Sequence, residues 1–534
     1  MKKETTFADF TRTDGQVAVI AQDKLTALPP PYDKPDKAPI RQLSPEQRQR
    51  LDASLDGVVA LGLTPPASPE EEQAFVEKFL VGLEKTLSAE DNWTFLQPLA
   101  HTLEYCVKCQ ICSDDCPAYV SSGRQEIYRP TFRPEILRRI INKHLKKEHP
   151  LVSKFFGSDI DLNWQTLARL AELAYRCTLC RRCAQTCLLG CDNAVVTREI
   201  RKLFSQQFGI APKELHEKGS VQQLKVGSTT GMTPHALRNI LEFIEEEIEE
   251  KTGKKIRIPV DKKGADMLLF HNAGEFMAWP ENLEAFAILL DAADVDWTLS
   301  SDIAGYDAVN YGVWYDDVQF ARVALRQAQA AKDLRVRKIS LGECGHAHKA
   351  MMVIADRILT GDLNIPRESI LPLMEDLVLS GKIKLDPRRN NFPVTLHDPC
   401  NMVRLMGIVS PQRRILEKIC PQFREMTPHG VRNYCCGGGS GFAITQSTNF
   451  PDWRSAVSGR MKMKQILEAF ADQPGPEVKK YVCAPCSNCK GQFRDMFEYY
   501  GVWEKSGILY GGLVELVVNA MVDNKKPFIE WEWH

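Results

Sequence analysis

The chain of 534 residues is long enough for two or three domains with cores of their own. Its 68 lysines and arginines nearly balance 69 aspartates and glutamates, so the net charge gives no reason to expect a nucleic-acid partner. The 17 cysteines are clustered at ligand spacings, and an odd number cannot all be paired in disulfides. This pattern favours metal sites in a reducing compartment.

The N-terminal residues MKKETTFADF lack the apolar core of a secretory signal, so we expect a cytoplasmic protein. No stretch approaches the ~18 consecutive apolar residues that a membrane-spanning helix needs, and the longest apolar run is 513–522. We therefore expect no direct membrane span. Any attachment to the inner face of the cell membrane should go through partner subunits.

Residues 1–89 are predicted to form an N-terminal extension with helices. Residues 1–40 are rich in proline and charge, which is typical of an extended arm that lies on another surface or subunit. Two helix starts are predicted at Ser44 and Ser68, because each serine precedes a proline and has a glutamine or glutamate three residues later.

Two runs of four cysteines dominate residues 90–205, and both have the spacing C-x2-C-x2-C-x3-C. This doubled run is the ligand pattern of a protein with two cubane [4Fe–4S] clusters, in which the fourth cysteine of each run reaches the other cluster. A pair of zinc sites is the weaker alternative, since such sites usually pair two C-x2-C hooks. The expected ligand sets are Cys106, Cys109, Cys112 with Cys187, and Cys177, Cys180, Cys183 with Cys116.

The second run departs from the pattern at its end. Leu188 stands where a proline is expected, and Cys191 offers a rival thiolate. We expect Cys187 to be the ligand because it keeps the spacing. An apolar stripe over 167–174 predicts a helix that runs directly into Cys177.

Residues 206–263 are predicted to be a helical linker, with one helix that starts at Thr233 and ends near Gly253. After Lys263, short apolar runs such as 267–270 and 394–396 read as buried strands between helices. We expect two similar α/β halves, 264–392 and 393–534, since comparable strand and turn segments recur in the same order.

The second half carries a third group of cysteines. It comprises Cys400, the adjacent pair Cys435 and Cys436, and the hooks Cys483, Cys486 and Cys489. Adjacent cysteines cannot easily bind one iron of an ordinary cubane, but they can bind neighbouring irons of an opened cluster. The glycines that follow Cys436 let backbone amides approach cluster sulfides closely.

This order of cysteines, C…CCG…C-x2-C, resembles the signature of heterodisulfide reductase catalytic subunits. Over residues 90–520 the chain is similar to the membrane-associated D type of that family. The resemblance implies an α+β multidomain fold, in which a helical two-[4Fe–4S] ferredoxin-like module precedes a pseudo-repeated α/β CCG domain. The first repeat is degenerate, since only Cys344 survives there. The implied ligands of one noncubane [4Fe–4S] cluster are Cys400, Cys435, Cys436, Cys486 and Cys489, which leaves Cys483 as the spare.

The resemblance also implies partners and a reaction. Electrons would come from menaquinol through a haem-bearing, DsrM-like membrane subunit, within a complex that has other subunits. They would cleave a disulfide or trisulfide of a small DsrC-like sulfur-carrier protein. A different class remains open: an iron–sulfur electron-transfer subunit of a flavin-dependent glycolate, lactate or glycerol-phosphate oxidase.

Several further residues are candidates. His397 is the better proton donor because it lies three residues before Cys400. Cys344 with His346 and His348 is expected to be a structural remnant of the lost site rather than a closed metal site. Cys420 is expected to be a buried apolar residue. Lys490 and Arg494 follow the last cysteine of the sequence. Both are expected to be solvated surface residues, although they could steer an acidic partner.

Overall fold

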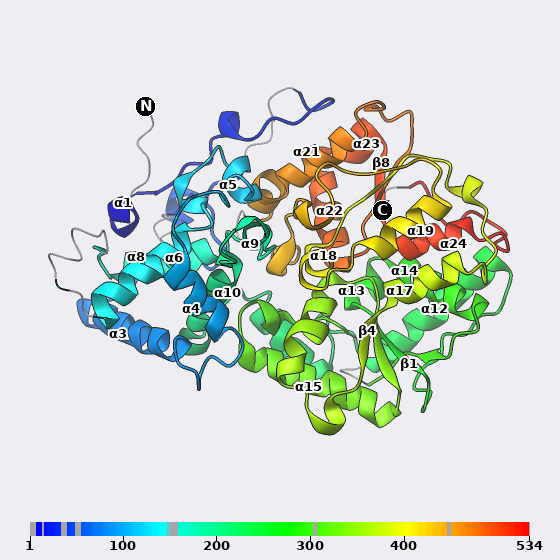
Figure 1. The fold of residues 1–534 in the computed structure, drawn as a ribbon, viewed down its shortest axis with the longest axis horizontal. Coiled ribbons are helices and arrows are strands. Elements are labelled where there is room, and N and C mark those ends of the chain that lie inside the picture. Colours follow the sequence, from blue (N-terminus) through cyan, green and yellow to red (C-terminus); the bar gives the residue numbers. More distant parts are fainter. Residues whose placement is uncertain are drawn as a thin grey trace.

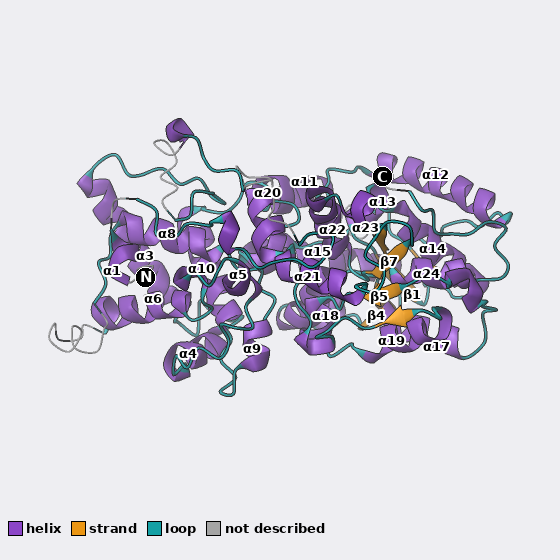
Figure 2. Ribbon diagram, turned by 90° about the horizontal axis from the view of Figure 1, so that it is seen from above, coloured by secondary structure: helices purple, strands orange, loops and turns teal. Residues whose placement is uncertain are grey.

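The computed structural model describes residues 7–12, 15–33, 40–47, 55–146, 149, 159–302, 307–445 and 450–532. A helical module occupies one side of the molecule and an α/β part occupies the other (Figure 1). All eight strands of the described residues lie in the α/β part, where helices surround them (Figure 2). The expected α+β architecture is thus confirmed.

The helical module is built around one long, buried helix, α10 (Asn193–Phe208), which packs against α3, α4, α6 and α8. Its N-terminal cap is Asp192, whose carboxylate accepts from the amides of Ala194 and Val195. The other helices are α1 (Phe7–Thr11), α3 (Pro69–Thr86), α4 (Leu96–Tyr105), α5 (Pro117–Ser121), α6 (Phe132–Ile140), α8 (Trp164–Ala174) and α9 (Arg182–Thr186).

The predicted helix starts are confirmed where the structure describes them. Ser68 caps α3 by accepting from the amide of Glu71. Ser44 and Gln47 form reciprocal bonds of 3.2 and 2.9 Å, but most of the helix expected after them lies outside the described residues. Helix α8 ends three residues before Cys177, as its apolar stripe predicted.

The described part of the N-terminal arm lies on its own chain. Tyr32 packs edge-on against Tyr500 with ring centroids 5.9 Å apart, and Arg460 donates to the carbonyl of Thr26. The two contacted residues belong to the second α/β half. The arm therefore joins the two ends of the sequence.

Two helices link the module to the sheets: α11 (Gln222–Val226) and α12 (Pro234–Thr252). Thr233 caps α12, and Gly253 ends it with φ +73°, as predicted. Helix α12 buries Leu237, Leu241, Ile244 and Ile248 in the core that both halves share.

The first half forms a parallel sheet in the order β2-β1-β3-β4, and the second half forms one in the order β6-β5-β7-β8. The two orders correspond strand for strand, so the predicted repeat is confirmed. The strands are β1 (Met267–Phe270), β2 (Trp297–Thr298), β3 (Lys338–Leu341), β4 (Arg367–Ser369), β5 (Val394–Leu396), β6 (Phe423–Arg424), β7 (Lys480–Cys483) and β8 (Ile508–Gly511).

The helices of the first half are α13 (Ala273–Met277), α14 (Pro280–Ala292), α15 (Asp317–Leu334), α16 (Gly345–His348) and α17 (Ile370–Leu379). Those of the second half are α18 (Cys400–Leu405), α19 (Ser410–Ile419), α20 (Phe450–Trp453), α21 (Arg460–Ala469), α22 (Ser487–Tyr500), α23 (Val502–Ser506) and α24 (Leu513–Ala520). The longest apolar run of the sequence is therefore largely α24, which is a core helix.

The carboxyl ends of the central strands β3 and β7 meet. Just beyond them the amide of Gly345 donates to Sγ of Cys486 at 3.4 Å, and the amide of Ser487 donates to the carbonyl of Glu343 at 3.0 Å. In parallel α/β sheets ligands bind beyond the carboxyl ends of the strands. The junction of the two halves is therefore the expected place for a site.

Among the described helices, none is long and apolar enough to cross a membrane.

Candidate iron–sulfur centres

The two cysteine loops of the helical module have the same backbone conformation. In each loop the residues on either side of the second cysteine have positive φ: Lys108 and Gln110 in the first, Leu179 and Arg181 in the second, with φ between 52 and 63°. Left-handed residues turn successive amides toward one side of a loop, where they can donate to an anionic group. The amide of Leu179 donates to Sγ of Cys177 at 3.4 Å.

The structure brings the first predicted set together. Burial raises the pKa of the Cys112 thiol to about 12, and the neighbouring thiols act in the same direction. These neighbours are Cys106, Cys116, Cys187 and Cys109. Cys109 is exposed, so this set lies at the surface of the module.

The second set is assembled across both runs. Burial raises the pKa of Cys116 to about 12, with further contributions from Cys177 and Cys180. Cys183 also has Cys180 and Cys177 among its close charged neighbours. Cys116, the fourth cysteine of the first run, therefore lies beside cysteines of the second run. This position agrees with the predicted exchange of the fourth ligand between the two clusters.

Cys191 lies beside the first set. Its amide donates to Sγ of Cys187 at 3.4 Å, and its thiol contacts the thiol of Cys187. Cys191 is fully buried, whereas Cys187 is half-buried. The contact makes Cys191 a neighbour of the predicted ligand.

The cysteines of the second α/β half form a chain of contacting thiols. Cys435 contacts Cys400 and Cys436, Cys436 contacts Cys489, and Cys489 contacts Cys486. We call these five the CCG thiols. Each of them except Cys400 is at most 3% exposed. They arise from the start of α18, a loop before α20, and the start of α22.

A glycine loop covers this group. The amides of Gly437 and Gly438 donate to the sulfurs of Cys435 and Cys436, each at 3.4 Å. Gly437 has φ +98°, and a Cβ there would lie 2.4 Å from Cα of Gly459. Only glycine allows this backbone to pack so close to the thiols.

His397 is held in one orientation beside the CCG thiols. Its Nε2 lies 3.2 Å from Sγ of Cys489, and its Nδ1 faces the side-chain amide of Asn433 at 3.4 Å. The Oδ1 of Asn433 accepts from Nζ of Lys462 at 2.6 Å, so the Asn433 amide nitrogen is the donor to Nδ1. Nε2 therefore carries the hydrogen and donates to the sulfur of Cys489.

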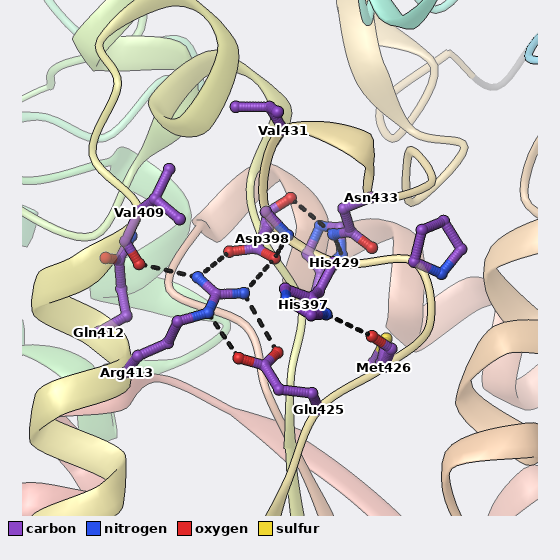
Figure 3. A network of polar contacts seen from close by, with 12 residues as sticks. His397, Asp398, Val409, Gln412, Arg413, Glu425, Met426, His429, Val431 and Asn433 are labelled. Carbon is purple, nitrogen blue, oxygen red and sulfur yellow. Dashed lines mark hydrogen bonds and ion pairs between the residues drawn. The ribbon is translucent and has the colours of Figure 1, made fainter.

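An ion-pair network supports the loop that carries Asn433. Arg413, on α19, lies between the carboxylates of Asp398 and Glu425 (Figure 3). The same Asp398 accepts from the amide of Gly430 at 2.6 Å, and its carbonyl accepts from Asn433 at 3.0 Å. Asp398, the residue after His397, is thus held by Arg413 through its carboxylate and by Asn433 through its carbonyl.

The CCG thiols touch the second cysteine run. The thiol of Cys435 contacts that of Cys180. Arg404 ties the same two segments, since its guanidinium donates to the carbonyls of Cys180 and Val431, each at 2.8 Å, and to that of Asn433. A Cβ on Gly439 would lie 2.6 Å from the carbonyl of Thr178.

The spare thiols have different positions. Cys483 lies in β7, where its charged neighbours are Glu343, Cys420, Glu515 and Asp398. Cys420 is buried, as expected. Burial and the neighbouring Cys486 raise the pKa of the Cys344 thiol, and its sulfur accepts from the side-chain amide of Asn272 at 3.5 Å.

Sequence reasoning missed or misread three polar residues. Lys462 and Asn433 carry no motif, and only their contacts reveal them: Asn433 contacts His397, and Lys462 contacts Asn433. The expectation that Lys490 is solvated is wrong: its side chain is fully buried, and its Nζ lies 3.4 Å from Glu275 and 3.6 Å from Glu515. Lys490 lies in the first turn of α22. Its side chain points to one carboxylate of each α/β half, and therefore into the junction of the halves rather than to solvent.

A cavity, which we call the sulfur cavity, opens beside the CCG thiols. Its wall includes Cys400, Cys436, Cys486 and Cys489. The first half contributes Trp314, His346 and Lys349, and the second cysteine run contributes Thr178 and Leu179. A molecule in this cavity would contact both the CCG thiols and the loop of the second run.

The donor chemistry of these groups fits iron–sulfur clusters. Throughout the described residues all cysteines are free thiols. Most of them are gathered in the three sets, where backbone amides donate to the sulfurs of Cys177, Cys435 and Cys436. Thiolates with amide donors are the usual setting of such clusters. Atoms of His397, Cys436 and Cys489 lie within 4.8 Å of one another, which is close enough to surround one metal ion.

Two family models match the chain. Residues 102–191 match a 4Fe-4S dicluster domain, and residues 394–494 match a cysteine-rich domain known as CCG. The chain thus contains a ferredoxin-like dicluster domain followed by a CCG domain.

Curated relatives match most of the length. An Hdr-like menaquinol oxidoreductase iron-sulfur subunit 2 from Archaeoglobus fulgidus is 25% identical, over 82% of this chain and 85% of that protein. The D-type subunit of a dihydromethanophenazine:CoB–CoM heterodisulfide reductase from Methanosarcina barkeri is 26% identical, over 78% and 94%. An EtfAB:quinone oxidoreductase from Syntrophomonas wolfei is 21% identical, over 72% and 54%. The chain is therefore similar to iron–sulfur subunits of oxidoreductases.

Proposed function

We propose that this protein is a heterodisulfide-reductase-like catalytic subunit of the DsrK type. It takes electrons from a membrane partner that oxidises quinol and reduces a disulfide or trisulfide of a DsrC-type protein in dissimilatory sulfur metabolism. The observation that carries the proposal is the contact between Cys180 and Cys435, which joins the dicluster domain to the CCG thiols.

The proposed ligands follow from the groups of thiols. Two cubane clusters would be held by Cys106, Cys109, Cys112 with Cys187 and by Cys177, Cys180, Cys183 with Cys116. One noncubane cluster would be held by Cys400, Cys435, Cys436, Cys486 and Cys489. When bound, the clusters supply one-electron transfers that end at a sulfur–sulfur bond.

The residues of the CCG site would handle the protons. Cleavage of one sulfur–sulfur bond consumes two electrons and two protons; a disulfide yields two thiols, and a trisulfide yields a thiol and a persulfide. His397 holds a hydrogen on Nε2 beside the sulfur of Cys489, and the Asn433–Lys462 pair keeps it in that tautomer. The glycine loop and the buried surroundings exclude water from the thiols.

The proposed place in the cell is the inner face of the membrane. The described part of the chain has no helix that could cross a membrane. We propose a haem-bearing, DsrM-like membrane subunit that holds this protein at the inner face of the membrane. The names of the relatives, a menaquinol oxidoreductase subunit among them, support such a complex.

The test is Cys436→Ser in the anaerobically purified protein. We expect reduction of the DsrC-type disulfide or trisulfide to be lost while both cubane signals in the EPR spectrum remain reducible. Cys420→Ala is the matched control, since Cys420 is buried outside the CCG thiols. Cys344 would be an unsuitable control because it neighbours Cys486. Unchanged turnover in Cys436→Ser would rule the proposal out.

A pure electron-transfer role is the second candidate, favoured by the similarity to an EtfAB:quinone oxidoreductase. In that role the chain would need a flavin-bearing partner, and no disulfide or trisulfide would be consumed. Purified protein that oxidises a reduced dye with a disulfide as the sole acceptor would exclude it.

A further inference from the structure

A cavity in the helical module, which we call the cubane cavity, encloses the second set of thiols. All four members of the set lie in its wall: Cys116, Cys177, Cys180 and Cys183. The wall also contains four arginines: Arg133, Arg176, Arg181 and Arg182. Three of the four are neutralised by a carboxylate at 2.5 to 2.9 Å: Arg176 by Asp56, Arg181 by Asp192 and Arg182 by Asp115.

Arg133 has no such carboxylate among the residues that the structure describes. It is 3% exposed, and its Nε donates to the hydroxyl of Thr197 at 2.8 Å, which is a neutral acceptor. Arg133 is one of the close charged neighbours of Cys116. A buried charge without a counter-charge is costly. A negatively charged group on the thiols of the second set would balance it.

Arg201, on α10, is a second cation of this kind and is fully buried. Its guanidinium donates to the carbonyl of Ala174 at 2.8 Å, to the carbonyl of Cys177 at 2.6 Å and to the hydroxyl of Ser440 at 2.9 Å. All three acceptors are neutral, and within the described structure Arg201 forms no ion pair with a carboxylate. The thiol of Cys177 is among its close charged neighbours. Arg201 therefore holds an uncompensated positive charge beside the second set.

The first set has a different electrostatic setting. Lys108 and Arg138 lie beside it, but both pair with the carboxylate of Glu135, at 3.0 and 2.7 Å. Cys109 is exposed, so water can solvate charge on this set. Fixed, unpaired positive charge is thus found at the buried second set, where water cannot do so.

We propose that Arg133 and Arg201 raise the reduction potential of the cubane held by the second set, so that it accepts electrons from the cubane of the first set. In this step one electron moves inward and no bond forms or breaks. A cubane with four thiolate ligands is an anion, and burial disfavours the further negative charge of its reduced form. Two guanidinium groups, which stay charged at any relevant pH, offset that cost.

The inference rests on the proposed function, since it takes the two sets as cubane ligands on the path of electrons to the CCG thiols. It assigns Arg133 and Arg201 as positioning residues, because neither touches a substrate. Arg404 also neighbours Cys180, but it lies at the junction with the CCG thiols, so its charge acts on both sites and cannot separate them.

The test is an anaerobic redox titration of the full-length, cluster-loaded protein, followed by EPR. Arg133→Met and Arg201→Met should each lower the midpoint potential of one cubane and leave the other unchanged. We expect electron transfer from the first cubane to the second to become about tenfold less favourable, which for one electron is a fall of about 59 mV. Arg133→Lys and Arg201→Lys keep the charge, so they should restore most of the potential.

Arg169→Met is the matched control. Arg169 is a buried arginine of the same module, 1% exposed, whose guanidinium donates to the carbonyls of Phe10 and Gly15 and lies outside the wall of the cubane cavity. Its loss should leave both cubane potentials unchanged, even where stability falls.

Unchanged potentials in both variants of Arg133 and Arg201 to methionine, or an equal fall in Arg169→Met, would overturn the inference. Loss of the cluster in a methionine variant supports it when the matching lysine variant keeps the cluster, and counts against it when both lose the cluster. If the potential falls as expected but the wild type reduces no disulfide or trisulfide, the role of the arginines stands and the proposed reaction fails.

Discussion

The thiol of Cys180 contacts the thiol of Cys435, although one belongs to the dicluster domain and the other to the CCG domain. Arg404 braces this contact by donating to the carbonyls of Cys180, Val431 and Asn433. In the proposed function, the path of electrons between the two domains runs through this arginine-supported junction.

Replacing Arg404 should disturb that path without removing a ligand. We expect Arg404→Met to lower turnover of a disulfide about tenfold or more, because three carbonyls lose a charged donor in a buried place. The dicluster signals should stay reducible by a strong reductant in EPR. Arg414→Met is the control, since Arg414 is an exposed residue of α19 that pairs with Glu375. Equal turnover in both variants would show that the junction does not limit electron transfer.

His397 should tune the CCG site through its bond to Cys489. Removing a donor from a ligand sulfur lowers the reduction potential, and loss of such outer partners typically costs about 10- to 100-fold in activity. We expect His397→Phe to show both effects in an EPR redox titration and in turnover. His429→Phe serves for comparison, because the ring of His429 bonds to the carbonyl of Met426 and, within the described structure, to none of the CCG thiols. A potential that does not move would contradict the assigned tautomer.

Gly437→Ala should disrupt the CCG loop. The added Cβ meets the backbone of Gly459, and the residue must hold φ +98°. We expect a loss of about 3 kcal/mol or more in stability and loss of the CCG spectroscopic signal. Gly381→Ala also has positive φ but open space around it, so it should cost only about 1 kcal/mol. Thermal unfolding of the two variants measures the difference.

His348 should make stability depend on pH. It is buried between the carbonyl of Cys344 and the hydroxyl of Ser369, each at 2.8 Å, and burial lowers its pKa to about 4. The unfolded chain therefore takes up the proton first, and stability falls as the pH drops below about 6.5.

Between pH 7.5 and pH 5.5 this single group should remove about 1.4 kcal/mol. His348→Gln should show a correspondingly smaller fall in unfolding temperature over that range. An identical pH slope in the variant and the wild type would mean that His348 does not stay neutral in the folded protein.

The sequence predicted the parts of the fold that local rules govern. Ser68 and Thr233 cap helices where expected, and the doubled cysteine spacing implied the exchange of Cys116 and Cys187 between sets. It did not predict Lys462 or the burial of Lys490. Each of these owes its role to segments far away in the chain, and a lysine without its tertiary surroundings reads as surface.

The exposure of the cysteine sets falls along the chain of thiols. Around the first set, which includes Cys187, Cys109 is exposed, Val107 is 70% exposed and Leu188 is 90% exposed, whereas Cys435 and Cys436 are 1% exposed. Dissolved oxygen and chelators therefore reach the outermost set long before the innermost. We expect brief exposure to air to destroy iron at the first set while the CCG site survives, so damaged protein would keep the site proposed for sulfur chemistry but lose its proposed supply of electrons.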